Sequence, residues 1–308
     1  MNKRRIGALD VSCVGLGCNN FGRTLDANAT AKVVNAALDA GINFFDTADS
    51  YSAGRSEEFV GRAIGKRRDD VVIATKFGSP LDDTRKGAHP DYVLRAAEDS
   101  LRRLGTDHID LYQLHRPDES VPIADTLGAL DKLVKAGKVR EIGCSNFTVE
   151  QLREAEHALP PGCARFVSVQ NEYSLLDREP ETSGLLHECA ANGLAFLPYF
   201  PLASGLLSGK YRKGQPPPAG SRIASGWHDE LLTEENLDIV EKLIAFAESR
   251  DHTLLELAVS WLVERPMVAS VIAGATTAKQ VKANAAAASW DMTEAEIQEI
   301  NRIAPQKS

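Results

Sequence analysis

Several short apolar segments of the chain end on a polar or ionisable side chain. Asp46, Lys76 and His115 each end one such segment. The next three segments also end on polar or aromatic groups, namely Ser145, Asn146, Gln170, Asn171 and Tyr199. A carboxylate or an ammonium group is costly to bury in an apolar strand without a partner. These positions are therefore candidates for an ion pair or for acid–base chemistry.

Two interpretations remain open when each residue is taken alone. Asp46 and Lys76 could form a salt bridge between adjacent strands, and His115 could be a core histidine with satisfied hydrogen bonds. Tyr51 adds a phenol in the loop that follows Asp46. Taken together, a carboxylate, an ammonium, a phenol and an imidazole favour a reactive site over four separate structural roles.

The apolar segments recur along the chain at a regular interval. The first seven are spaced by roughly 30 residues, which is the length of one strand-plus-helix unit. Most are apolar on both faces, as is typical of parallel strands covered by helices. This alternation predicts an α/β fold, a (β/α)8 TIM barrel, whose reactive groups lie at the carboxyl ends of the strands. The expected strands are 14–18, 43–47, 71–77, 109–115, 139–145, 166–171, 194–198 and 268–273.

Two features depart from the regular repeat. Residues 4–7 and 11–14 predict a β-hairpin that caps the barrel at the N-terminus. The last interval between strands is much longer than the others and contains an open, proline-rich loop at 212–227, so we expect a long insertion before strand 8. No other shift in composition marks a boundary, and we expect a single domain over residues 1–308.

Composition restricts the partners. The chain has 308 residues, of which 43% are hydrophobic and 25% are charged, as is ordinary for a globular protein. Its net charge of −8 argues against nucleic-acid and anionic-membrane partners, because both need a basic face. The five cysteines include no C-x-x-C pair, so neither a disulfide framework nor a zinc ribbon is indicated. No apolar stretch of signal-peptide length follows the first residues, and we expect a cytoplasmic location.

Six sequence segments, most of which contain a polar strand end described above, resemble in their order along the chain those of the aldo-keto reductase family. The resemblance covers essentially the whole chain and includes similarity to the potassium-channel β-subunit branch. It implies a (β/α)8 barrel that reduces an aldehyde or ketone to an alcohol with a nicotinamide cofactor, usually NADPH, and without a Rossmann domain. The matching segments are 15–22 (GLGCNNFG), 41–51 (GINFFDTADSY), 74–78 (ATKFG), 109–118 (IDLYQLHRPD), 138–147 (KVREIGCSNF) and 197–211 (LPYFPLASGLLSGKY).

The resemblance implies a catalytic tetrad of Asp46, Tyr51, Lys76 and His115. Hydride addition to a carbonyl creates an alkoxide that must be protonated as it forms, and a phenol is a weak acid near neutral pH. We expect the Lys76 ammonium to favour the phenolate and so to strengthen Tyr51 as an acid. Asp46 would keep the lysine charged and oriented, and His115 would hydrogen-bond the carbonyl oxygen of the substrate.

The resemblance also implies the residues that bind the cofactor. Ser145, Asn146 and Gln170 match positions that recognise the carboxamide, and Tyr199 matches the aromatic residue that stacks on the nicotinamide ring. Residues that match positions around the pyrophosphate and the adenosine extend the site through the insertion and past strand 8. They are Asn19, Leu202, Ser208, Lys210, Arg222, Gly274, Thr276, Gln280 and Asn284, with Asp46 also beside the cofactor.

One part of the adenosine segment departs from the family pattern. Many relatives place an arginine near position 276 or 277 to bind the 2′-phosphate, whereas this chain has Thr276 and Thr277. Lys279 or Lys282 is a candidate to replace it, and use of NADH is the alternative. We expect NADPH, bound near the start of the helix that follows strand 8.

The substrate cannot be named from the sequence beyond a small-molecule carbonyl compound. Tyr51, His115 and Trp227 are the expected substrate contacts, and no metal ligand set is expected. Two alternatives remain: an NADPH-binding regulatory subunit with little turnover, as in the channel β-subunit branch, and a metal-dependent barrel hydrolase. Lys76 between Asp46 and His115 argues against the hydrolase. The oligomeric state is not predicted.

Overall fold

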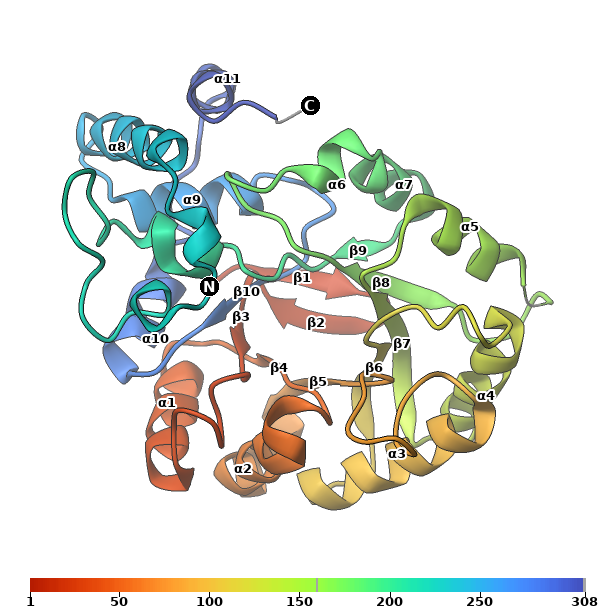
Figure 1. Cartoon of the computed structure of the whole chain (residues 1–308). Coiled ribbons are helices and arrows are strands. Elements are labelled where there is room, and N and C mark those ends of the chain that lie inside the picture. Colours follow the sequence, from red (N-terminus) through yellow and green to blue (C-terminus); the bar gives the residue numbers. More distant parts are fainter. Residues whose placement is uncertain (159, 307–308) are drawn as a thin grey trace.

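Eight parallel strands form the centre of the computed structural model, which describes residues 1–158 and 160–306 (Figure 1). Their order in the sheet is β10-β3-β4-β5-β6-β7-β8-β9. Successive strands along the chain are therefore neighbours, as in a TIM barrel. The strands are β3 (Val14–Gly17), β4 (Phe44–Asp46), β5 (Val72–Phe77), β6 (Ile109–Leu114), β7 (Val139–Ser145), β8 (Phe166–Gln170), β9 (Ala195–Phe196) and β10 (Val271–Gly274).

Backbone hydrogen bonds close the barrel between β9 and the segment that leads into β10. The amide of Phe196 donates to Met267 O at 2.7 Å, and the amide of Ala269 donates back to Phe196 O at 3.0 Å. The amide of Ile272 donates to Pro198 O at 3.1 Å. The predicted (β/α)8 barrel is confirmed, although its seventh strand is shorter than expected and its eighth begins later.

Helices surround the barrel, and α8 and α11 lie at its periphery (Figure 1). Several begin at the side-chain caps expected of helix N-termini: the Asp26 carboxylate accepts from Ala29 N, and Thr148 and Gln151 form a capping box. The long insertion before the eighth strand is confirmed and includes α8. The helices are α1 (Ala27–Asp39), α2 (Arg55–Ile64), α3 (Pro90–Leu104), α4 (Ile123–Lys135), α5 (Val149–His157), α6 (Glu179–Thr182), α7 (Leu185–Asn192), α8 (Glu234–Glu248), α9 (Leu254–Val263), α10 (Ala278–Ala286) and α11 (Glu294–Ile303).

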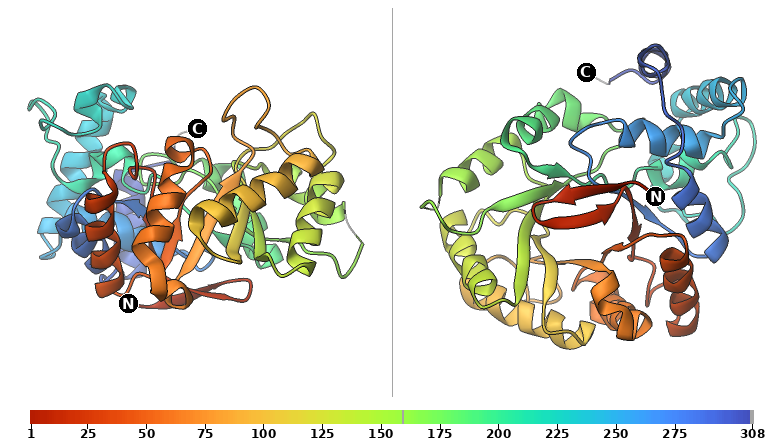
Figure 2. Two further views of the ribbon diagram at one scale, coloured as in Figure 1. Left: turned by 90° about the horizontal axis from the view of Figure 1, so that it is seen from below. Right: turned by 180° about the vertical axis from the view of Figure 1, so that it is seen from behind.

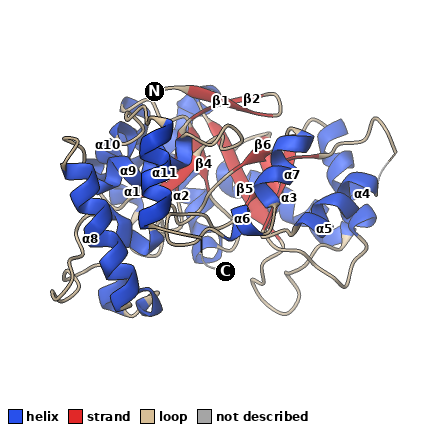
Figure 3. Cartoon of the chain, turned by 90° about the horizontal axis from the view of Figure 1, so that it is seen from above, coloured by secondary structure: helices blue, strands red, loops and turns tan. Residues whose placement is uncertain are grey.

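An N-terminal hairpin covers the end of the barrel opposite the carboxyl ends of the strands (Figures 2 and 3). It pairs β1 (Lys3–Ile6) with β2 (Leu9–Ser12), so the turn falls at Gly7, whose φ is 54°. The predicted hairpin is confirmed with a shifted register: Val14, expected in its second strand, belongs to β3. Positive φ is readily adopted by glycine, which explains the position of the turn.

Arg4 fastens this hairpin to the seam of the barrel. Its guanidinium donates to Val263 O at 2.6 Å, to Arg265 O at 3.1 Å and to Val268 O at 2.5 Å. These carbonyls belong to the end of α9 and to the segment that pairs with β9. One side chain therefore supplies hydrogen bonds to three backbone carbonyl groups near the segment that closes the sheet.

The interior of the barrel is divided into an apolar and a polar part. Phe44, Val72 and Leu111 form one cluster with Ile6, Leu9 and Val11 of the hairpin. Alternate residues along a strand face the same side, so Asp46, Lys76 and Gln113 lie in the same interior one layer or more toward the carboxyl ends. The period-two pattern thus places apolar packing beneath a buried polar layer.

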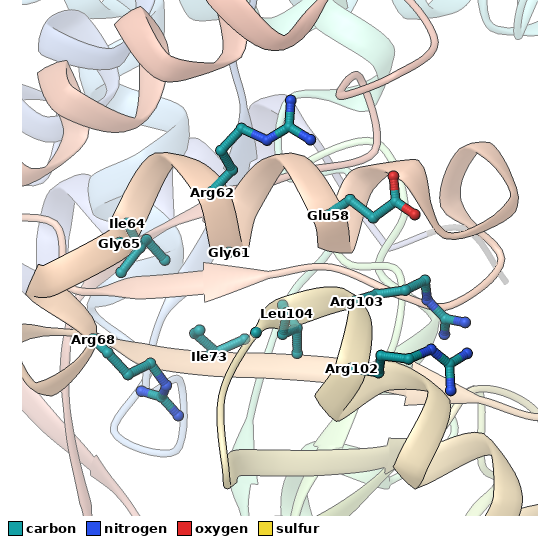
Figure 4. A pocket seen from close by; sticks show the side chains of 11 residues that line it. Glu58, Gly61, Arg62, Ile64, Gly65, Arg68, Ile73, Arg102, Arg103 and Leu104 are labelled. Carbon is teal, nitrogen blue, oxygen red and sulfur yellow. The ribbon is translucent and has the colours of Figure 1, made fainter.

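Helices α2 and α3 pack closely because α2 carries Gly61 at their contact. A Cβ atom at Gly61 would overlap the backbone carbonyl of Leu104 at the end of α3. Figure 4 shows Gly61 on α2 and Leu104 at the end of α3, below and to the right of it. In contrast, a Cβ atom at Gly128 in α4 would meet no atom within 4 Å.

This contrast gives a stability test. Gly61→Ala should lower the free energy of unfolding by about 1–3 kcal/mol, because the two helices must separate. Gly128→Ala should raise it by roughly 0.5–1 kcal/mol, because alanine favours helix and nothing clashes. Urea unfolding followed by circular dichroism measures both. Equal effects of the two substitutions would contradict the packing described here.

Candidate active site

A deep pocket opens at the carboxyl ends of the strands. Its volume is about 1070 Å³, which lies at the upper end of the range for ligand pockets in proteins. All of the predicted site residues line it except Lys76, which is buried beneath its floor. The predicted residues in the lining are Asn19, Asp46, Tyr51, His115, Ser145, Asn146, Gln170, Tyr199, Leu202, Ser208, Lys210, Arg222, Trp227, Gly274, Thr276, Gln280 and Asn284.

Lys76 and Asp46 form a buried ion pair at the base of the pocket. Lys76 Nζ donates to Asp46 Oδ2 at 2.7 Å and to Thr47 O at 2.9 Å, and the two residues are 0% and 3% exposed. Burial alone would lower the pKa of Lys76, but the neighbouring Asp46 carboxylate outweighs it and the pKa is raised. The lysine therefore stays protonated although it is enclosed.

Two glutamine amides complete the environment of the carboxylate. Gln170 Nε2 donates to Asp46 Oδ1 at 3.0 Å, and Gln113 Nε2 approaches the same oxygen at 3.5 Å. Each oxygen of Asp46 thus has a donor, which is the condition for a stable buried charge. Gln113 was not among the predicted site residues. It lies two positions after the inward-facing Leu111, and this alternation along the strand could have identified it as an interior residue.

Tyr51 stands over the lysine. Lys76 Nζ lies 5.1 Å from the centroid of the Tyr51 ring, and the ring meets His115 edge-on with centroids 5.9 Å apart. The following residues, Ser52 and Ala53, have φ of 54° and 55°, a strained conformation for residues with a side chain. The turn that presents Tyr51 is therefore held in a costly conformation by its surroundings.

Burial is the largest influence on the Tyr51 phenol. It raises the pKa, the Lys76 ammonium lowers it, and the net pKa is above the ordinary value. The predicted effect of Lys76 on the phenol is present, but desolvation of the phenolate is larger and acts in the opposite direction. Tyr51 therefore carries its proton at neutral pH.

His115 is neutral. Burial first, and then the charges of Lys76 and Arg116, lower its pKa to about 3. Its Nδ1 is buried without a hydrogen-bond partner, and Asn146 Nδ2 donates to its backbone carbonyl at 2.9 Å. A neutral imidazole at this place can donate or accept one hydrogen bond toward a ligand.

Polar side chains beside the tyrosine are held rigidly. The Tyr199 hydroxyl donates to Asn146 Oδ1 at 2.8 Å, and Ser145 Oγ donates to Gln170 O at 2.7 Å. Asn146 has a positive φ of 62°, as asparagine tolerates, and burial raises the pKa of Tyr199 to about 12. The aromatic ring and the amides are thus fixed relative to one another before a ligand binds.

The far end of the pocket lies at the start of α10. Thr277 caps this helix, and the Thr276 amide and hydroxyl donate to Gln280 Oε1 at 2.7 and 3.0 Å. Lys279 lines the pocket, whereas Lys282 does not. Of the two lysines considered for a 2′-phosphate, the structure therefore brings only Lys279 to the site.

The insertion crosses the pocket and touches the loop after β3. Arg222 donates to Asn19 Oδ1 and Asn20 Oδ1, both at 3.2 Å. The guanidinium of Arg23 lies 4.6 Å from the ring of Trp227, which is 40% exposed. The predicted contact residue Trp227 is thus placed at the mouth by a cation–π contact with a residue that the sequence did not single out.

Several lining residues were not predicted. They are Arg23, Arg116, Glu172, Phe200 and His228, together with small and backbone-lining positions. Arg116, Glu172 and Phe200 directly follow predicted residues at strand ends, which is the signal that could have indicated them. Arg23 and His228 lie on long loops, whose course no periodicity predicts.

Charge in the pocket differs from that of the whole chain. The net charge is −8, yet the ionisable side chains that line the pocket are mostly cationic. The lining cations are Arg23, Arg116, Lys210, Arg222 and Lys279, against the carboxyl groups of Asp46 and Glu172. Because Asp46 is already paired with Lys76, the pocket suits a ligand with several negative charges.

The residues present fit a nicotinamide dinucleotide. Amide and hydroxyl groups lie beside Tyr199, cations line the middle, and a capped helix N-terminus with Lys279 lies at the far end. Ser204 Oγ and His115 Nδ1 are buried polar atoms without a protein partner. Within the described ranges, no group of three or more His, Cys, Asp or Glu could hold a metal ion, and no helix has the length and apolarity to cross a bilayer.

A second hollow, of about 480 Å³, lies outside the barrel between α2 and α3 (Figure 4). Arginines dominate its wall, but three of them already have acidic partners. Arg68 contacts Asp110, Arg102 contacts Asp99, and Arg103 contacts Glu57, at 2.6, 2.8 and 2.6 Å. These pairings indicate a structural role for the hollow.

Comparison with known proteins agrees with this geometry. A model of the aldo/keto reductase family matches residues 13–305. The chain is 35% identical over 273 residues to a probable voltage-gated potassium channel subunit beta of Oryza sativa, covering 86% of this chain and 83% of that protein. It is 32% identical over 279 residues to L-glyceraldehyde 3-phosphate reductase of Escherichia coli, covering 86% and 80%.

A solved structure is also similar to this chain. The glycerol dehydrogenase of Gluconobacter oxydans superposes with a TM-score of 0.85 at 29% identity, covering 98% of this chain and 94% of that one. A barrel of this similarity, with its polar residues at the carboxyl ends of the strands, defines an oxidoreductase that acts on aldehydes or ketones. The chain belongs to the aldo/keto reductase family.

The ion pair at the base of the pocket gives a test of its energetics. Lys76→Met should lower the free energy of unfolding by about 3–5 kcal/mol, because it leaves the Asp46 carboxylate buried and unpaired. The double variant Asp46→Asn with Lys76→Met should recover most of that loss, since no buried charge remains. Chemical unfolding of the three proteins at pH 7 measures this. A double variant less stable than Lys76→Met alone would contradict it.

Proposed function

We propose that the protein is an NADPH-dependent reductase that converts an aldehyde or ketone into an alcohol. The observation that carries this proposal is the contact of Tyr51 and His115 at the pocket wall directly above the buried Lys76–Asp46 pair. A proton donor, a neutral hydrogen-bonding imidazole and a fixed positive charge then surround one point in space. This is the requirement for stabilising and protonating an alkoxide.

Bound NADPH supplies the hydride. Tyr199 would support the nicotinamide ring, and Ser145, Asn146 and Gln170 would hold its carboxamide. Lys210, Arg222 and the backbone around Ser208 would neutralise the pyrophosphate. Gly274, Thr276, Gln280 and Asn284 would contact the adenosine, with Lys279 near its phosphate. These roles are the ones that the family resemblance implies, and the presence of all these residues in the lining of one pocket supports them.

Each residue of the tetrad has a separate task in proton transfer. Tyr51 keeps its proton at neutral pH and donates it to the oxygen that becomes negative. Its own developing charge is stabilised by the Lys76 ammonium, whose pKa Asp46 raises. His115, neutral at this pH, hydrogen-bonds the carbonyl oxygen and directs it toward the phenol. The energy gained from Lys76 is therefore largest in the transition state, when the phenol loses its proton.

The phenol provides the direct test. Tyr51→Phe should lower kcat for aldehyde reduction by about 10²–10⁴, the range for loss of a general acid, while NADPH binding is retained. Stopped-flow or steady-state NADPH oxidation gives the rate, and quenching of protein fluorescence by NADPH gives the affinity. Wild-type rates in the variant across a panel of aldehydes would contradict the assignment.

Lys279 provides a test of cofactor preference. Wild-type protein should use NADPH better than NADH by more than about tenfold in kcat/KM, equivalent to 1.4 kcal/mol. Lys279→Met should reduce this preference because it removes the cation nearest the adenosine end. Lys282→Met on the same helix, outside the pocket, should leave it unchanged. If Lys279→Met leaves the preference for NADPH over NADH unchanged, residues other than Lys279 distinguish the two cofactors.

A second candidate function is a cofactor-binding regulatory subunit. Similarity to relatives named potassium channel subunits over most of the chain favours it. Tight NADPH binding without turnover of any carbonyl compound, together with a stable complex with a membrane partner, would support this function and contradict the reductase.

A further inference from the structure

A buried carboxyl group lies between Asp46 and Tyr51 and has no role in the proposed reaction. Asp49 is 1% exposed, and neither of its carboxyl oxygens makes a hydrogen bond of normal geometry, although the Ser50 amide and the Tyr92 hydroxyl lie near enough to interact with it. Buried polar groups in native proteins nearly always have partners, so this group requires an explanation.

The backbone around Asp49 is hydrogen-bonded both to Lys76 and to the turn that carries Tyr51. The amide of Asp49 donates to Lys76 O at 3.1 Å, and the amide of Tyr51 donates to Ala48 O at 3.2 Å. The carbonyl of Thr47 accepts from Lys76 Nζ. A displacement of Asp49 would therefore move the turn that carries Tyr51 relative to the lysine.

Asp49 does not line the pocket, and its carboxyl group interacts instead with the charges of an ion pair between α2 and α3. Arg103 Nε donates to Glu57 Oε2 at 2.6 Å, and Thr75 Oγ1 donates to Glu57 Oε1 at 2.6 Å. Arg103 also lies against the end of the Tyr51 turn, since a Cβ atom at Gly54 would be 2.6 Å from its Cδ. The same arginine thus supports the turn and neutralises Glu57.

The charges around Asp49 do not balance when it is ionised. The groups that face it are Glu57 from α2, Arg103 and Tyr92 from α3, and Tyr112 from β6. The Arg103 guanidinium is the only cation among them, and its Nε is committed to Glu57. The Tyr112 hydroxyl is buried without a partner. Two carboxylates then share one guanidinium in a largely buried site, which favours a protonated Asp49.

We propose that Asp49 is a positioning residue for Tyr51, and that loss of its proton displaces the Tyr51 turn and lowers reductase activity. The predicted loss of activity rests on the proposed function, whereas the predicted displacement of the turn does not. Ionised Asp49 faces the Glu57 carboxylate inside the protein, and the repulsion is relieved when the loop moves outward. Ser52 and Ala53 hold a strained backbone conformation in the present position of the turn, so this position is costly to maintain.

The direction of the pH effect follows from the folded-state pKa. Burial, and then the charge of Glu57, raise the pKa of Asp49 to about 7. The turn is therefore in place below this pH and is lost as the pH rises through it. The protonated fraction of such a group falls roughly tenfold between pH 6 and pH 8, which sets the largest loss of activity that Asp49 can cause.

The test compares wild-type protein with Asp49→Asn, which has nearly the same shape and cannot ionise. Glu58→Gln is the matched control, because Glu58 is a neighbouring, exposed carboxylate on α2. We expect the ratio of kcat/KM at pH 8 to that at pH 6 to be several-fold higher in Asp49→Asn than in the other two proteins. The same ratio in all three would overturn the proposal.

A second measurement does not depend on catalysis. Arg55 directly follows the turn and is exposed, so the rate of tryptic cleavage after Arg55 reports displacement of the turn. Between pH 6 and pH 8 this rate should rise several-fold more in wild type and Glu58→Gln than in Asp49→Asn. The comparison among proteins cancels the pH dependence of trypsin itself.

The two measurements separate this proposal from the proposed function. If no carbonyl compound is reduced but the cleavage rates differ as expected, the reductase assignment fails and the coupling of Asp49 to the turn stands. If turnover occurs but the cleavage rates and pH profiles do not differ among the three proteins, the role of Asp49 is wrong and the reductase assignment stands.

Discussion

The buried ion pair between Lys76 and Asp46 is the interaction on which the site depends. The Lys76 ammonium has no exposed surface, and a carboxylate, a backbone carbonyl and two amides satisfy the buried pair. Three alternate strands, β4, β6 and β8, and the loop after β4 supply these groups. The barrel can do this because its strands converge on a common interior. The same charge then acts on Tyr51 and His115: it adds to the effect of burial in lowering the pKa of the imidazole, and it opposes the effect of burial on the pKa of the phenol.

The interior of the barrel serves stability and chemistry in different layers. Below the ion pair, the hairpin and the amino ends of the strands enclose an apolar cluster that excludes water. Above it, the strands end in groups that face the pocket. A low-dielectric layer beneath a charged one strengthens every interaction of the lysine, so packing far from the pocket contributes to the electrostatics of the site.

The sequence predicted the barrel, the hairpin, the insertion and the residues that share the pocket. It did so because strand periodicity determines which residues end a strand, and parallel strands bring those ends together. Arg23, Glu172 and His228 could not be predicted in this way, because their positions depend on the paths of loops. The net effect on the Tyr51 phenol also required the structure: sequence spacing indicated the lysine nearby but not how strongly burial disfavours the phenolate. Asp49 reads in sequence as an ordinary polar loop residue, and only its burial without a hydrogen bond of normal geometry distinguishes it.

Arg4 has a consequence for how the chain reaches this state. Its guanidinium binds carbonyls that lie 259 to 264 positions later in the sequence, at the segment that completes the sheet. Contacts of such separation form late, because a long loop must close before they contribute free energy. During synthesis, the hairpin therefore lacks the carbonyl groups that bind Arg4 until residues 263–268 have been made. The circular sheet becomes complete only when β10 pairs with β3, more than 250 positions earlier in the sequence.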